Sequence, residues 1–186
     1  FHALEAYQSI VERRHGGGVG VKWVECLQGD AVWNAIESGA VRKDLFDAAI
    51  ALVPGKTPAQ IRQLGPSTLF RFEYLDGFAG AVVMLPTQAE TNAVAVKMKG
   101  PSSVLATRFD ERSEPRYPHF AFLLKAIEQM FHSGKPTYPI ERTVITSGIL
   151  DRALTSLADG QKRLSTPELS LTYQPVDYPH APLPKL

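Results

Sequence analysis

The chain has 186 residues, a formal net charge of +1 and 44% apolar residues. These ordinary values indicate one large globular domain and give no electrostatic case for nucleic acid or an anionic membrane as a partner. No apolar run approaches the roughly 20 residues that cross a bilayer. The single cysteine, Cys26, excludes an internal disulfide. No secretory signal pattern is visible, so we expect a cytoplasmic protein, and export stays open because the true N-terminus is not visible.

The first 27 residues predict a helix and then a strand. Residues 1–15 carry an apolar stripe at helical spacing: Leu4, Tyr7, Ile10 and Val11. A run of three glycines ends this helix, and residues 19–27 alternate as a strand. The alternation sets Val21 with Trp23 on one face and Val24 with Cys26 on the other.

The glycine run at 16–18 does not fit a dinucleotide-binding fingerprint. That motif leaves a strand and opens a helix, whereas here a helix precedes the glycines and a strand follows them. The position that requires the third glycine holds Val21. We therefore predict no cofactor-binding residue within this chain.

Residues 28–66 predict an excursion of short helices away from the sheet. Thr57 and Gln60 have the spacing of a capping box, with Pro58 at the first helical position. The excursion can form a pocket rim, a subunit contact or a plain connector, and the pattern does not choose among them.

Four further strands are expected before residue 111, and one near the end of the chain. Residues 68–74 place Phe70, Phe72 and Tyr74 on one face, and Asp76-Gly77 is a hairpin turn signal. The return strand at 78–85 is apolar on both faces. Strands at 92–98, 104–110 and 168–173 complete an antiparallel meander.

Residues 119–160 predict two amphipathic helices joined by a turn, and together they would cover one face of that sheet. The first has its apolar stripe at Phe120, Leu123, Leu124, Ile127 and Phe131, opposite Lys125, Glu128 and Gln129. The fold class expected is α+β, with an open, largely antiparallel sheet and helices on one face. Residues 1–173 form one domain, and residues 174–186 form a proline-rich, extended tail.

A homo-oligomer, a dimer or tetramer, is expected because one helix pair can cover only one sheet face. The strand at 78–85 is apolar on both faces, so a second copy would cover the other face. The competing explanation is that residues 28–66 fold over this face within the same chain.

Histidines are the residues most open to a chemical role. His2 and Glu5 stand three apart and share a helix face, while His119 begins a later helix. No Cys/His spacing indicates a metal site, and we predict no metal ligands. From the residues alone, the pattern favours a structural or solvated role for the His2–Glu5 pair, while His119 is as open to a polar role at the helix end as to a site role.

Two stretches, taken in order, resemble the C-terminal domain of the glucose-fructose oxidoreductase and inositol dehydrogenase (Gfo/Idh/MocA) family. The first is FHALEAYQSIVERR at 1–14, where a helical histidine is followed three residues later by an acid. The second is 119–168, with a Phe-bearing helix, a Gly-Lys-Pro turn, a long helix that ends in Gly, and a final strand. The resemblance covers residues 1–173.

The resemblance implies a substrate-binding and oligomerisation domain of an NAD(P)-dependent oxidoreductase acting on a sugar, polyol or related compound. In such proteins an N-terminal Rossmann domain, missing here, binds NAD or NADP, so the isolated chain is expected to be inactive and to bind neither. His2 matches the catalytic histidine, and Glu5 stands where the family usually has Asp. Glu5 and His119 are the expected substrate-binding residues. The alternative is a non-catalytic assembly or carbohydrate-binding module with the same fold.

Overall fold

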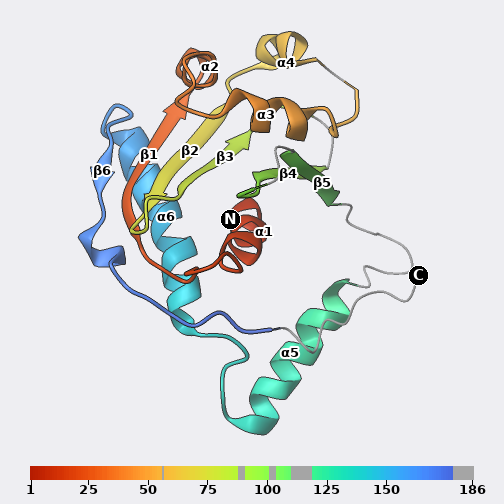
Figure 1. Cartoon of the computed structure of the whole chain (residues 1–186), viewed down its shortest axis with the longest axis vertical. Coiled ribbons are helices and arrows are strands. Elements are labelled where there is room, and N and C mark those ends of the chain that lie inside the picture. Colours follow the sequence, from red (N-terminus) through yellow and green to blue (C-terminus); the bar gives the residue numbers. More distant parts are fainter. Residues whose placement is uncertain (56, 88–90, 101–103, 110–118, 178–186) are drawn as a thin grey trace.

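The computed structural model describes residues 1–55, 57–87, 91–100, 104–109 and 119–177 (Figure 1). Its helices and strands follow in chain order: α1 (His2–Val11), β1 (Val21–Gln28), α2 (Asp30–Glu37), α3 (Lys43–Ile50), α4 (Pro58–Leu64), β2 (Thr68–Tyr74), β3 (Ala79–Met84), β4 (Asn92–Lys97), β5 (Val104–Phe109), α5 (His119–Ser133), α6 (Ile140–Ala158), β6 (Leu164–Ser165) and the short 3₁₀ helix η1 (Pro167–Leu169). None of the helices within these ranges is long and apolar enough to span a membrane.

A four-stranded antiparallel sheet forms the centre of the molecule, with strand order β3-β2-β1-β6. The β2–β3 hairpin turns at Asp76-Gly77, where Gly77 has a φ of 81° and donates its backbone N–H to the Tyr74 carbonyl at 2.9 Å. That positive φ is the reason the turn requires glycine. The α+β class and the antiparallel pairing are confirmed.

One face of this sheet is covered by α1 and α6. Phe70, Phe72 and Tyr74 of β2 all point into this core, as their alternation predicts. In β1, however, the pairing with β2 is irregular between Val21 and Trp23, and Val21 joins the same core as Val24. The predicted grouping of Val21 with Trp23 is therefore wrong, because a bulge reverses the alternation at this point.

The opposite face is covered at one end of the strands by α2, α3 and α4 (Figure 1). Leu69 of β2 and Val83 of β3 pack there against Trp33, Ile36 and Ile61. Helices thus lie on both faces, which corrects the expectation of helices on one face only. The two-sided apolar strand β3 finds its cover within the chain, so it gives no reason for an oligomer through this surface.

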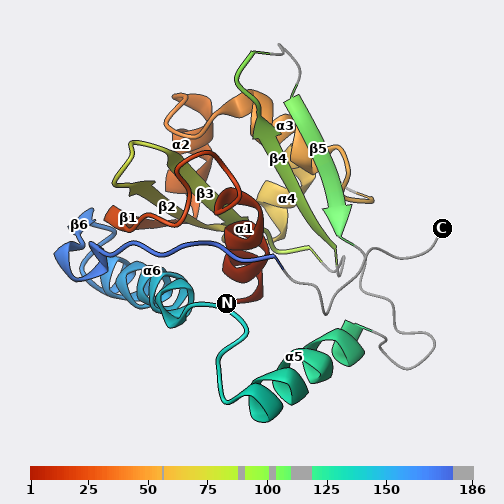
Figure 2. The same cartoon turned by 60° about the horizontal axis from the view of Figure 1, so that its bottom comes forward.

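Strands β4 and β5 pair only with each other and form a separate two-stranded sheet (Figure 2). They pack against α3 instead of continuing the central sheet. The predicted strands are therefore present, but the single meander is wrong after β3.

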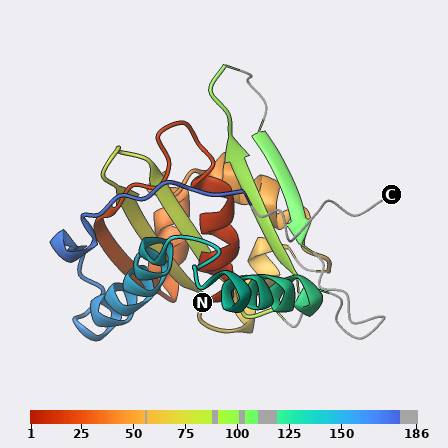
Figure 3. The ribbon, with the colours of Figure 1, turned by 90° about the horizontal axis from the view of Figure 1, so that it is seen from below.

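The two helices predicted as a pair behave differently. α6 packs across β1 and buries Ile145, Ile149 and Ala153. α5 buries only Ala126 and lies to one side of the sheet strands when the molecule is seen from below (Figure 3). The expectation that both helices cover the sheet is wrong for α5.

The predicted strand at 168–173 is replaced by η1 and extended chain, which forms an isolated β-bridge between Val19 and Thr172. Pro167 lacks the N–H that a strand ladder needs. Leu169 is buried instead against α6, where a Cβ at Gly148 would lie 2.3 Å from the Leu169 side chain. Of the predicted tail, residues 178–186 lie outside the described residues.

Candidate functional site

His2, the expected catalytic residue, is the first residue of α1, and its side chain is exposed. Its ring meets the Phe1 ring edge-on, with ring centres 5.9 Å apart. Glu5 lies one turn further along α1, but its carboxylate faces α6. Thr146 donates its hydroxyl to Glu5 Oε1 at 2.5 Å, and Arg142 forms an ion pair with the same carboxylate.

His119, the other expected site residue, begins α5, where its ring stacks on Phe120 with the centres 4.6 Å apart. Figure 1 shows α5 standing clear of α1. The structure therefore brings Glu5 together with α6, and it does not bring His119 to the helix that carries His2.

A buried polar cluster joins α1 to α6. Arg142 is 7% exposed as a side chain and lies between two carboxylates of α1, those of Glu5 and Glu12. Its Nε donates to Glu12 Oε2 at 3.2 Å, and its guanidinium also donates to the Glu5 backbone carbonyl at 3.1 Å. Two carboxylates share one guanidinium here, so further donors are needed to satisfy them.

Thr146 supplies such a donor to Glu5 and Tyr173 supplies one to Glu12, while Gln8 and Tyr74 extend the network. Tyr173 donates its hydroxyl to Glu12 Oε2 at 2.6 Å and accepts a hydrogen bond from Gln8 Nε2 at 2.7 Å. Tyr74 of β2 donates its hydroxyl to Gln8 Oε1 at 2.6 Å. α1 is thereby fixed to the sheet, to α6 and to the C-terminal segment at once.

Both tyrosines remain protonated donors. Burial raises the pKa of Tyr173, and its hydrogen bond to Glu12 raises it further. Burial also raises the pKa of Tyr74 well above its ordinary value. A tyrosine that stays protonated does not accept a proton, so these two hydroxyls act as hydrogen-bond donors that hold α1 in place.

The sequence prediction missed this cluster. Gln8 and Glu12 are both buried, yet the predicted apolar stripe ran through Tyr7, Ile10 and Val11. A signal was present: Leu4, Gln8 and Val11 share helical spacing, so a polar residue stands inside the buried stripe.

The sheet surface that α2–α4 leave uncovered carries a second group of side chains. Arg71 donates to Glu25 Oε2 at 2.5 Å, and these two are direct cross-strand neighbours. The Arg163 guanidinium lies 4.0 Å from the centre of the Trp23 ring. These polar and aromatic side chains therefore already have partners within the chain, through cross-strand charge pairing and cation–π stacking.

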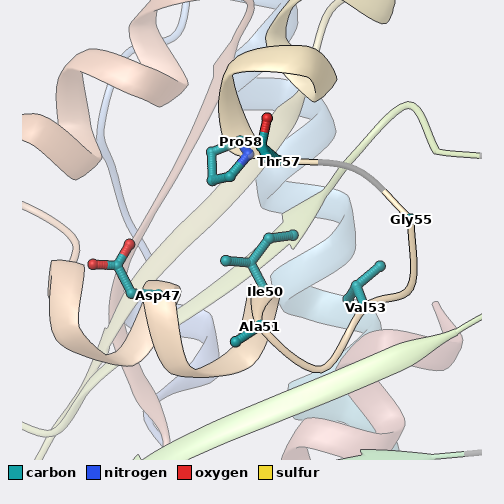
Figure 4. A pocket seen from close by; sticks show the side chains of 7 residues that line it. All are labelled: Asp47, Ile50, Ala51, Val53, Gly55, Thr57 and Pro58. Carbon is teal, nitrogen blue, oxygen red and sulfur yellow. The ribbon is translucent and has the colours of Figure 1, made fainter.

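An open hollow of about 450 Å³ lies between the end of α3 and the start of α4 (Figure 4). It is lined by Asp47, Ile50, Ala51, Val53, Gly55, Thr57 and Pro58. Asp47 already pairs with Lys43, and the Thr57 hydroxyl caps α4 by accepting from the Gln60 backbone N–H. The lining residues that the structure describes offer no convergent catalytic groups.

Among the described residues, no group of three or more His, Cys, Asp or Glu side chains could hold a metal ion. Comparison of the chain with models of known protein families, with curated proteins and with solved structures finds no match. The chemical case for a site therefore rests on the geometry of α1.

Proposed function

We propose that this chain is the substrate-handling and assembly domain of an NAD(P)-dependent oxidoreductase acting on a sugar, polyol or related compound in the cytoplasm. The supporting observation is an exposed imidazole, that of His2, at the start of a helix whose next turns are held by a buried charge cluster. Proton transfer needs a group that faces substrate on a rigid support. The resemblance in sequence supplies the reaction class.

In this proposal His2 moves the proton of a substrate hydroxyl, while Glu5 acts through its bond to Arg142. The carboxylate of Glu5 is occupied by Arg142 and Thr146, so its contribution is to fix the first turn of α1. His119 has no assigned part in this step, because α5 stands clear of α1.

The nicotinamide cofactor would be held by another domain. At the turn of residues 16–18 the C-terminal segment packs against Gly18, where a Cβ would lie 2.1 Å from the Tyr173 carbonyl oxygen. This turn leads from a helix into a strand, the reverse of the order in a dinucleotide-binding fingerprint. The residues of this chain would therefore serve the substrate alone.

Three measurements test the proposal. Fluorescence titration of the purified chain with NADH and NADPH should show no saturable micromolar binding. The reading frame upstream of Phe1 should encode a Gly-rich strand–turn–helix unit. In a protein with that unit, His2→Asn should lower turnover by ~100- to 10,000-fold with the thermal unfolding midpoint unchanged. Unchanged turnover would remove His2 from the mechanism.

The second candidate is a non-catalytic assembly module, and the exposed apolar face of α5 favours it. Nuclear magnetic resonance of the chain with a panel of sugars and polyols separates the two. Chemical-shift changes centred on His2 and the start of α1 favour the enzyme domain. Self-association without any such change favours the module.

A further inference from the structure

α5 presents a continuous apolar stripe to solvent. Its 15 residues place six large apolar side chains at helical spacing, and all six are exposed: Phe120, Leu123, Leu124, Ile127, Met130 and Phe131. The exposed fraction reaches 64% for Leu124 and 77% for Phe131. Core-facing helices normally bury such a stripe, whereas the other described residues leave this one largely exposed.

The exposed area is large for a surface left in water. With about 200 Å² for a whole aromatic side chain, the stripe exposes roughly 600 Å² of apolar surface, the upper end for a single patch on a monomer. Burying the stripe on two copies would remove roughly 1,200 Å², the lower limit for a specific and stable interface.

A copy of the same helix fits this stripe without electrostatic cost. The stripe contains no charged residue, and Lys125 and Glu128, which are opposite in sign, lie outside it. Fifteen residues give a helix about 22 Å long, enough for four turns of contact in an antiparallel pair. A two-fold axis would present the same stripe on both partners, as an isologous contact requires.

Other surfaces are less suited to self-association. The strand that motivates an oligomer from sequence, β3, is covered at Val83 by the α2–α4 cluster. On the uncovered part of that sheet face, Arg71 pairs with Glu25 and Arg163 lies over Trp23, so these side chains already have partners within the chain.

We propose that two copies of this chain associate through α5, whose apolar stripes pack against each other as an antiparallel helix pair. This inference rests on the assembly part of the proposed function and assigns it a surface. The small area gives a dimer that dissociates on dilution.

Sedimentation velocity of the full chain, from low to high micromolar concentration, tests the proposal. The expected result is a concentration-dependent shift from monomer to dimer. Leu124→Glu should raise the dimer dissociation constant on the order of 100-fold or more, because the side chain is lost from both partners. Phe131→Gln should act in the same direction.

The matched control is Leu154→Glu, an equally exposed leucine at 56% on α6. It should leave the dimer unchanged, and far-ultraviolet circular dichroism should show all three variants folded. A wild type that stays monomeric throughout overturns the proposal, as does a dimer that survives both α5 variants or one that Leu154→Glu disrupts equally.

The assembly function and the α5 surface can be overturned by different results. A dimer that survives the α5 variants but is lost in Ala79→Lys, on the uncovered sheet face, would keep the assembly function and overturn only α5 as its surface. A monomer at every concentration would overturn both. Neither result bears on His2, whose test is turnover.

Discussion

α5 and α6 are consecutive helices, and α5 is the more apolar of the two, yet only α6 is part of the core. α6 buries Ile145 and Ile149 against the sheet, and Gly148 lets it approach Leu169 closely. α5 buries Ala126 alone. The difference shows that an amphipathic pattern predicts that a helix will be covered, but does not predict what covers it.

The largest effect is expected where α6 holds α1. Arg142→Leu leaves Glu12 buried without its guanidinium, which should cost about 3–5 kcal/mol of unfolding free energy. Chemical denaturation measures it, with Arg152→Leu as the control on the same helix. Arg152 pairs with Glu168 at the surface, so its loss should cost less than about 1 kcal/mol. Equal effects would show that the buried cluster does not anchor α6.

The next effect concerns the sheet face that the chain covers by itself. Val83→Lys places a charge against the α2–α4 cluster, where Val83 is partly buried, and should cost about 2–3 kcal/mol because the ammonium loses hydration among apolar side chains. Ala79→Lys on the same strand is exposed and should be nearly neutral. If the Val83→Lys variant keeps its stability but changes an oligomer into a monomer, the oligomer interface would instead lie on this face.

Local signals were sufficient for much of the fold. The capping box at Thr57 and Gln60 forms as predicted, and the Asp76-Gly77 hairpin is present, because both depend on residues close in sequence. The bulge at Val21–Trp23 and the η1 segment were missed, since each depends on packing against distant parts of the chain.

The candidate site was predictable only in part. His2 was singled out by its pattern, but its support was not, because Arg142 and Tyr173 contact α1 from 130 or more residues away. No spacing rule within one helix identifies such partners. The position of α5 was equally unpredictable, because an apolar stripe has the same sequence pattern whether a sheet or a second chain covers it.

A smaller effect on stability is expected for Tyr173, whose hydrogen bond to Glu12 holds the C-terminal segment against α1. Tyr173→Phe removes one donor to Glu12 and should cost about 1–2 kcal/mol. Tyr7→Phe is the matched comparison. The buried Tyr7 hydroxyl makes no hydrogen bond within the described ranges, so its removal should be neutral or stabilising. If Tyr7→Phe costs more stability than Tyr173→Phe, Tyr173 does not hold the C-terminal segment against α1.

The smallest effect is a dependence on alkaline pH. Burial raises the pKa of Tyr74 above its ordinary value of about 10. The unfolded chain therefore loses this proton first, so this stabilisation is complete below about pH 10 and is lost as the pH rises above it. Tyr74→Phe should make the alkaline fall in unfolding free energy shallower. Parallel curves for the variant and the wild type would show that Tyr74 does not contribute.

Amide hydrogen exchange of α5 and α6, followed as a function of protein concentration, tests the division between them most directly. The amides of Ile145, Ile149 and Ala153 in α6 should exchange slowly at every concentration, because the sheet covers them within one chain. The amides of α5 should exchange rapidly in dilute solution and become protected as copies associate. Protection of α5 that equals that of α6 and does not change with concentration would contradict α5 as the surface of assembly.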